Sequence, residues 1–515
     1  MKSSLRHSNT STLIRFIKEK NGEFRFLEDT KDSHFWSLEQ KKRSLALFHK
    51  AAKEVPAYKH FLKKNRVNPE KIKSWDDFQK VPITNKKKYL KRYPLNELCW
   101  GGDLNKPLVF TSTSGSTGTP TYFVRSSDLD WQYSLLAEEF LQNSLRNSKG
   151  ETLVIICFGM GVWIGGLISY KAFEIASQRL NTSLSLITPG INKTEIFNAL
   201  KNLSLYYKNL ILVGYPPFIK DIIDEAPLNG LNLKKLNVKF VFAAEAFTES
   251  FRNYLVKKVN LKNSHLDTMN IYGTAEIGAM AYETPLSILI RRIALKKPEL
   301  FRDIFGGISK TPTLAQFNPL FINFECINGA IVITGNNEMP LIRYGIGDHG
   351  GVFSYKQMET ILKKHGVDIE SEAKKGGLAH TLNELPFVFV FERIDFSVTL
   401  YGLQVYPETI RETLFEKPFN KFLSGKFTLI TKFTSKHNQY IEINIEMKKD
   451  VDVILNSLQK RLLRRIVYNM RLNNSEFREL SDYLKEKANP KLVFWRSEAP
   501  EFFKPGVKQK WVRKI

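Results

Sequence analysis

Residues 111–123 form a segment whose residue types could bind the phosphates of a nucleotide. The segment reads Thr-Ser-Thr-Ser-Gly-Ser-Thr-Gly-Thr-Pro-Thr-Tyr-Phe and follows an apolar run at 108–110. Glycines let the backbone turn tightly and expose its N–H groups, and hydroxyls add further donors for a polyphosphate. The residues predicted to contact phosphate are Thr113, Ser114, Gly115, Ser116, Thr117 and Gly118. Because the segment matches neither the Walker A pattern nor the Gly-x-Gly-x-x-Gly fingerprint, a flexible linker is the alternative interpretation.

Two further segments follow apolar runs and carry groups suited to a base and a metal ion. Residues 270–276 read Asn-Ile-Tyr-Gly-Thr-Ala-Glu, and residues 243–246 read Ala-Ala-Glu-Ala. Tyr272 could stack on a purine, and Glu276 could hold Mg²⁺, which prefers oxygen ligands. Open α/β sheets place such ligand loops at the carboxyl ends of their strands. Taken singly, a core aromatic, a surface acid and a plain strand-to-helix turn explain these residues better.

Three segments nearer the C-terminus place charged residues in turn or linker sequences. Residues 345–348 read Gly-Ile-Gly-Asp, which predicts a tight turn that presents Asp348. One carboxylate can accept hydrogen bonds from both hydroxyls of a ribose, although an Asp beside glycines is by default a turn former. Arg393-Ile394-Asp395 lies where the composition changes, as in an interdomain linker. The basic segment 504–510 reads Lys-Pro-Gly-Val-Lys-Gln-Lys, and most such segments are solvated tails.

These segments are embedded in an alternation of strand and helix patterns. Apolar runs at 153–158, 209–214 and 238–243 predict buried strands, and helices are expected after the second and third of them. Residues 35–64 predict a helical lead-in. The alternation predicts an α/β domain with a largely parallel sheet.

From about residue 394 the pattern changes. Apolar residues alternate at 427–433 and at 441–447, which predicts a β-hairpin. A helix at about 451–471 and a strand at 492–495 are expected to follow. These elements predict a separate small α+β domain of about 120 residues.

The composition favours a folded protein that works in a reducing compartment. Its 515 residues are 43% hydrophobic, and its net charge of +25 comes from 77 basic and 52 acidic residues. That charge suits nucleotide or CoA-type ligands; because the lysines are dispersed and no recognition motif is present, no nucleic-acid partner is expected. The uncharged stretch 153–170 contains four glycines, so it predicts a strand, a turn and a helix rather than a membrane span. Three distant cysteines and an N-terminus without a secretory signal predict a cytoplasmic protein.

In their order and spacing, the segments resemble the motifs of the adenylate-forming (AMP-binding) superfamily, most closely its phenylacetate–CoA ligase-like and capsule-biosynthesis-type branch. The resemblance runs from about residue 35 to the end and includes Val-Pro-Ala-Tyr at 55–58, Pro-Ile-Thr-Asn-Lys at 82–86 and Tyr-Gly-Leu-Gln-Val-Tyr-Pro at 401–407. It implies an α/β N-terminal adenylation domain with largely parallel sheets, at 1–394, and a small mobile α+β lid, at 395–515. It also implies two half-reactions. A carboxylic acid and ATP give an acyl-adenylate and pyrophosphate, and a thiol, commonly that of coenzyme A, then takes the acyl group.

The resemblance further implies a role for each matching residue. The 113–118 segment would hold the ATP phosphates, and Ala244, Glu245, Ala246, Tyr272 and Gly273 would line the adenine. Asp348 and Arg393 would reach the ribose, and Glu276 would bind Mg²⁺. Asp395 would be the hinge of the lid, and Lys508 would be the catalytic lysine between the carboxylate and the α-phosphate. The implied partners are ATP, a small carboxylic acid, and coenzyme A or another acyl acceptor.

Four departures from the family pattern leave two alternatives open. Thr119, Ala275 and Val507 replace a lysine, a hydroxyl residue and a glycine, and Gly345-Ile346 replaces Arg-Thr. One lost charged contact costs roughly 1.5–3 kcal/mol, so activity could be reduced or altered. The acyl group could instead pass to an amine, a hydroxyl or a carrier protein. Alternatively, the chain could be a degenerate member that binds without catalysis.

Overall fold

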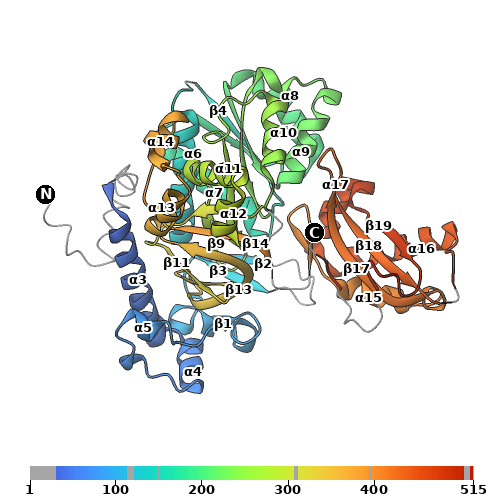
Figure 1. The fold of residues 1–515 in the computed structure, drawn as a ribbon, viewed down its shortest axis with the longest axis horizontal. Coiled ribbons are helices and arrows are strands. Elements are labelled where there is room, and N and C mark those ends of the chain that lie inside the picture. The colour runs from blue at the N-terminus through green and yellow to red at the C-terminus, as the bar shows by residue number, and fades with distance from the viewer. Residues whose placement is uncertain are drawn as a thin grey trace, which may run out of the picture.

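The computed structural model shows a large α/β part followed by a smaller C-terminal part that lies beside it (Figure 1). The structure describes residues 30–112, 121–148, 150–306, 311–393, 397–449, 451–503 and 511–513. The helices of the larger part are α3 (Ser33–Glu54), α4 (Pro56–Lys64), α5 (Trp75–Phe78), α6 (Ser127–Leu145), α7 (Ile164–Leu180), α8 (Lys193–Asn202), α9 (Pro216–Glu225), α10 (Glu249–Val259), α11 (Pro285–Lys296), α12 (Pro298–Phe305), α13 (Tyr355–Lys364) and α14 (Ile369–Lys375). Helices α3 and α4 confirm the predicted helical lead-in. They are separate because Pro56 forces an extended conformation on Val55.

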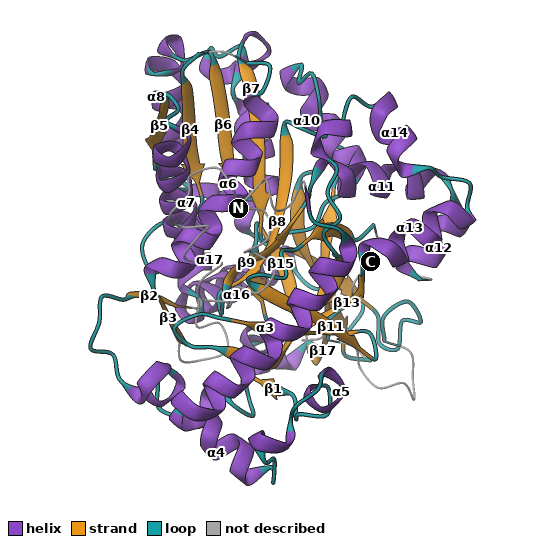
Figure 2. Ribbon diagram, turned by 90° about the vertical axis from the view of Figure 1, so that its left-hand side faces the viewer, coloured by secondary structure: helices purple, strands orange, loops and turns teal. Residues whose placement is uncertain are grey.

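One half of the central sheet is parallel. Its strands lie in the order β8 (Thr268–Thr274), β7 (Asn237–Ala243), β6 (Asn209–Gly214), β4 (Thr152–Cys157) and β5 (Leu184–Ile187). Alternate residues of β4 enter two different clusters: Leu153 and Ile155 pack with α8, α9 and α10, whereas Val154 and Ile156 pack with α6 and α7. Helices therefore cover both faces (Figure 2), which explains why these strands are continuous apolar runs. The predicted α/β class is confirmed, as is the strand, turn and helix at 153–170.

The other half of the sheet is antiparallel. From β8 outward it continues with β9 (Gly278–Tyr282), β10 (Thr313–Gln316), β14 (Phe387–Arg393), β13 (Leu341–Phe353), β12 (Ala330–Gly335) and β11 (Ile322–Ile327). The short strand β1 (Thr84–Asn85) pairs with β13. A separate hairpin consists of β2 (Val109–Ser112) and β3 (Tyr122–Arg125).

The predicted tight turn at Asp348 is wrong, because Asp348 lies inside strand β13. The glycines there serve the bend and the close packing of the strand: Gly347 has a φ of 87°, and a β-bulge follows at His349 and Gly350. A Cβ atom on Gly350 would lie 1.9 Å from the carbonyl oxygen of Phe389 on β14. Strand pairing on both sides therefore overrides the local preference for a turn.

The C-terminal part confirms the predicted α+β elements. Its elements are β15 (Val398–Leu400), β16 (Leu403–Val405), α15 (Pro407–Phe415), β17 (Leu423–Phe433), β18 (Gln439–Met447), α16 (Asn456–Asn473), α17 (Ser475–Leu484) and β19 (Lys491–Trp495). The hairpin is β17–β18, and β19 adds to β18 in parallel. The helix expected from about 451 begins only at Asn456, because Leu455 has an extended ψ of 137°.

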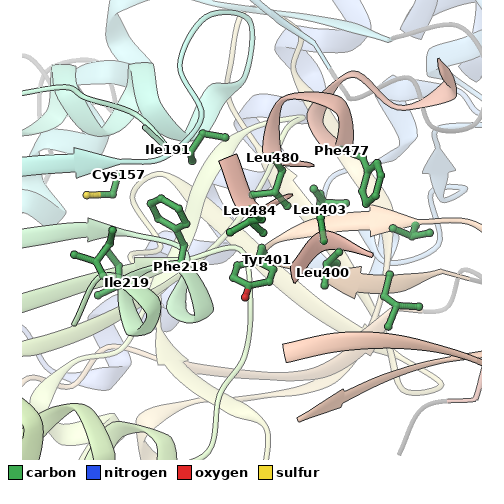
Figure 3. Packing of buried hydrophobic residues seen from close by; sticks show 14 of the residues in the cluster. Cys157, Ile191, Phe218, Ile219, Leu400, Tyr401, Leu403, Phe477, Leu480 and Leu484 are labelled. Carbon is green, nitrogen blue, oxygen red and sulfur yellow. The ribbon is translucent and has the colours of Figure 1, made fainter. Parts of the chain in front are cut away.

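The two parts share one hydrophobic cluster (Figure 3). Phe477, Leu480 and Leu484 of α17 belong to the same cluster as Phe218 of α9 and Ile191, which precedes α8. The smaller part therefore packs on the α8–α9 face of the parallel half-sheet. Within the described ranges, no helix combines the length and the apolar character needed to cross a membrane.

Candidate functional site

The predicted phosphate segment, Thr113 to Gly118, lies outside the described residues. The two strands that precede and follow it are described, and they pair antiparallel from Val109–Arg125 to Ser112–Tyr122. The amide of Ser112 donates to the carbonyl of Val162 at 2.9 Å, which ties the hairpin to the glycine turn before α7. Two buried polar atoms of the larger part, the indole Nε1 of Trp163 at this turn and Oγ1 of Thr274, have no hydrogen-bond partner among the described residues.

The structure brings together the two segments predicted to line an adenine. Strands β7 and β8 are parallel neighbours, with Ala243 opposite Ile271, so residues 244–246 and 272–273 follow adjacent strands. The side-chain amide of Asn270 donates to the carbonyl of Glu245 at 3.0 Å, which holds the first segment against β8. Ala244 adopts a left-handed φ of 74°, which turns the chain sharply at the end of β7.

Tyr272 and Asp348 also meet. The phenol of Tyr272 donates to Oδ2 of Asp348 at 2.6 Å, and its ring lies 6.2 Å from that of Phe324. Asp348 is only 6% exposed. It is the cross-strand partner of Arg393 on β14, so the backbones of the two predicted ribose residues are adjacent, although the side chain of Arg393 is outside the described part. A purine-stacking candidate and a ribose candidate therefore share one hydrogen bond.

Glu276 lies in the turn between β8 and β9, at the same end of the sheet. The phenol of Tyr344 donates to its Oε1 at 3.4 Å, and the Asn337 amide donates to its backbone carbonyl at 3.4 Å. In the described ranges, no group of three or more His, Cys, Asp or Glu side chains is arranged so that it could hold a metal ion. A single half-buried carboxylate fits a Mg²⁺ ion whose remaining ligands are phosphate oxygens and water, rather than a site built entirely by protein.

Glu245 is held from the smaller part of the molecule. Its carboxylate accepts hydrogen bonds from the amide of Gly402, between β15 and β16, and from Nε2 of Gln439 at 2.7 Å. Burial raises the pKa of Glu245 to about 7, and the two donors oppose that shift. Gly402 belongs to the motif at 401–407 that the sequence analysis identified, whereas no feature of the sequence pointed to Gln439.

The predicted hinge Asp395 and the predicted catalytic Lys508 lie in segments 394–396 and 504–510, outside the described residues. Residues after the second segment are described again: Val512 forms a bridge with Leu429 of β17, and Trp511 packs on Phe427. Residues 511–512 therefore lie against the sheet of the smaller part.

Comparison with known proteins gives relatives in both sequence and fold. No protein-family model matches the chain. Phenylacetate-coenzyme A ligase of Aromatoleum evansii is 24% identical over 260 residues, which are 50% of this chain and 54% of that protein. The ligase of the same name from Pseudomonas putida is 21% identical over 225 residues, 43% of this chain and 47% of that protein. The chain thus spans about half the length of the curated relatives it matches.

Among solved structures, 2-hydroxyisobutyryl-CoA ligase in complex with 2-HIB-AMP and CoA aligns with a TM-score of 0.61 and 15% identity. The alignment covers 93% of this chain and 90% of that one. A second structure of that ligase, in the postadenylation state with R3-HIB-AMP, aligns with a TM-score of 0.50. The resemblance found in the sequence is thus confirmed: the chain has the fold of the adenylate-forming ligases and is similar in sequence to phenylacetate–CoA ligases.

Proposed function

We propose that the protein activates a carboxylic acid with ATP and passes the acyl group to a thiol, that of coenzyme A. The observation that carries the proposal is the hydrogen-bonded pair Tyr272 and Asp348, beside the 244–246 loop and Glu276 at one end of the sheet. This arrangement offers an aromatic plane, a ribose acceptor and a metal ligand in one place. The solved relative adds support, because 2-hydroxyisobutyryl-CoA ligase was solved in complex with 2-HIB-AMP and CoA.

In the proposed first half-reaction, a carboxylate oxygen of the acid attacks the α-phosphorus of ATP. A bond forms between that oxygen and the α-phosphorus. The bond between the α-phosphorus and the oxygen that bridges it to the β-phosphate breaks, and pyrophosphate leaves. The carboxylate of Asp348 would accept hydrogen bonds from the ribose hydroxyls. The phenol of Tyr272 donates to the same carboxylate and so fixes its orientation. Mg²⁺ bound by Glu276 and the phosphates would offset the negative charge that the attacking anion must approach. Lys508 would supply a compact second cation at the same place.

In the proposed second half-reaction, a thiolate attacks the carbonyl carbon of the acyl-adenylate, and AMP leaves with the electrons of the C–O bond. The thiol needs access to a carbonyl that the first half-reaction encloses. We therefore propose that residues 395–515 act as a mobile domain that turns at Asp395 relative to residues 1–394. The buried, unpartnered donors Trp163 Nε1 and Thr274 Oγ1 are candidates for contacts to the acid or the adenylate.

The test is ATP–pyrophosphate exchange measured with a panel of aliphatic and aromatic carboxylic acids. We expect at least one acid to support exchange, and we expect Lys508→Ala to reduce it by at least about 100-fold, because one buried cation in a phosphoryl-transfer site supplies several kcal/mol. Lys504→Ala and Lys510→Ala are matched controls, because they remove the same charge from neighbouring positions. Exchange that survives Lys508→Ala would remove Lys508 from the catalytic role, and a loss of exchange in Lys504→Ala or Lys510→Ala would assign that role to the lysine removed.

Two further measurements separate the proposal from its alternatives. Acyl-CoA formation from acid, ATP and CoA identifies the acceptor, and the same assay with amines and sugars tests the other acceptor classes. If no member of the panel supports acid-dependent formation of AMP, that result contradicts the assignment as a ligase and favours a binding protein.

A further inference from the structure

The contact between Glu245 and the C-terminal part has an unusual chemistry. Glu245 is the only acid of the 243–246 loop. Its carboxylate accepts hydrogen bonds from two neutral donors of the smaller part, the Gly402 amide and the Gln439 side chain. No Lys, Arg or His lies within ion-pair distance of its carboxylate in the described part of the chain. The carboxylate is therefore stabilised by hydrogen bonds that exist only while the two parts keep this orientation.

Gln439 is at the centre of this contact. Its side chain is only 3% exposed at the start of β18, and its two amide atoms have different partners. Oε1 accepts from the backbone N–H of Tyr401 at 2.6 Å, and Nε2 donates to Oε2 of Glu245 at 2.7 Å. A primary amide accepts on its oxygen and donates from its nitrogen at the same time, and the shorter amide of Asn would lack the reach.

The backbone beside Gln439 is packed so closely that the contact admits little adjustment. Tyr401 and Gly402 have left-handed φ values of 48° and 86°. A Cβ atom at Gly402 would lie 2.4 Å from the ring of Tyr215 and 3.2 Å from Cβ of Ala244. The phenol of Tyr401, in turn, donates to Asp221 of α9 at 3.1 Å. The 401–402 turn is thus fitted against both the 244 loop and α9.

We propose that Gln439 is a positioning residue that couples the orientation of the C-terminal domain to the conformation of the nucleotide loop at 244–246. The functional consequence rests on the proposed function; the coupling itself rests only on the contacts. In the orientation seen here, Gln439 holds the 401–402 turn and Glu245 together. When the domain turns away, Glu245 loses both donors and the 244–246 loop loses its support from the other domain.

The test exchanges the amide and the carboxylate between the two positions. Gln439→Glu keeps an acceptor for the Tyr401 amide but replaces the donor to Glu245 by a second carboxylate. The double variant Glu245→Gln with Gln439→Glu restores a hydrogen bond between the two parts, with the donor now at position 245 and the acceptor at position 439. Gln459→Glu is the matched control, because Gln459 makes its hydrogen bond to the Ile454 carbonyl inside its own domain.

The first readout is amide hydrogen exchange in peptides that cover residues 244–246 and 401–402, which requires no turnover. We expect Gln439→Glu to speed exchange in both peptides about tenfold, the double variant to restore most of the protection, and Gln459→Glu to leave it unchanged. Equal protection in Gln439→Glu and the wild type, or no recovery in the double variant, would overturn the coupling. If Gln439→Glu does not fold, Gln439→Asn removes the reach without adding a charge and is judged by the same criterion.

The second readout separates the two half-reactions. We expect Gln439→Glu to slow about tenfold the half-reaction that proceeds in the orientation seen here, while the other half-reaction stays within about twofold of the wild type, because only one of acid-dependent ATP–pyrophosphate exchange and acyl transfer to CoA would use this contact. Equal losses in both half-reactions would indicate a general structural role and contradict a positioning role. A wild-type protein without acid-dependent exchange would refute the proposed ligase, whereas the hydrogen-exchange comparison would still decide the coupling.

Discussion

Two carboxylates of the site, Asp348 and Glu245, are held in opposite ways. Asp348 is fixed from within the larger part, by Tyr272 on β8 and by strand pairing on both sides of β13. Glu245 follows β7 in the same sheet, but its carboxylate is held by Gly402 and Gln439 of the smaller part. The first arrangement involves only residues of the larger part, whereas the second needs the smaller part in the orientation seen here. The proposed ribose contact of Asp348 is therefore independent of the smaller part, whereas the conformation of the 244–246 loop is not.

The largest effect is expected at the carboxylate that is independent of domain orientation. Asp348→Ala removes two proposed hydrogen bonds to the ribose, each worth roughly 1.5–3 kcal/mol with a charged acceptor, so acid-dependent ATP–pyrophosphate exchange is expected to fall by at least about 100-fold. Asp303→Ala is the control, because Asp303 pairs with Lys364 and His365 on the surface. If exchange by the folded Asp348→Ala protein stays within threefold of the wild type, Asp348 does not bind the ribose.

A smaller effect is expected from pH, and it acts on the carboxylate that depends on orientation. The pKa of Glu245 rises from its ordinary 4.5 to about 7 in the present orientation, so this orientation binds the proton more tightly than one in which Glu245 is solvated. Protonation of Glu245 therefore stabilises the present orientation. This stabilisation is complete below pH 4.5 and is lost as the pH rises through 7. Glu476, at the start of α17 near Tyr215, also has its pKa raised to about 7 by burial and acts with the same sign.

Small-angle scattering of the ligand-free protein measures this effect. Between pH 6 and pH 8, the ratio of the present orientation to others is expected to fall by up to about tenfold for Glu245 alone, and by less if its partial exposure screens it. Burial also raises the pKa of the neighbouring phenols Tyr215 and Tyr401, so these stay neutral over that range. The variant with Glu245→Gln and Glu476→Gln is expected to show a flat profile. A wild-type profile that is equally flat would mean that neither carboxylate is buried by domain orientation.

The same contrast separates what the sequence could predict from what it could not. Strand β6 was predicted with its observed bounds, 209–214, because a parallel strand buried on both faces must be a continuous apolar run. Asp348 was predicted as a residue that binds the ribose. The tight turn predicted around it was wrong, because the pairing of β13 with β12 and β14 cannot be inferred from the local sequence. Gln439 carried no signal, since its partner Glu245 lies 194 residues away and the contact depends on how two domains meet.

The smallest expected effect tests whether Asp348 needs its internal support. Tyr272→Phe keeps the ring that would stack on adenine and removes only the hydroxyl that holds Asp348 at 2.6 Å. One hydrogen bond of this kind contributes about 1 kcal/mol, so the KM for ATP is expected to rise about fivefold with little change in kcat, because the chemistry itself is untouched. Tyr206→Phe, on an exposed ring, is the control. A KM that does not change would show that strand pairing alone orients Asp348, and the contrast between the two carboxylates would then lie in the backbone of β13 rather than in its side-chain partner.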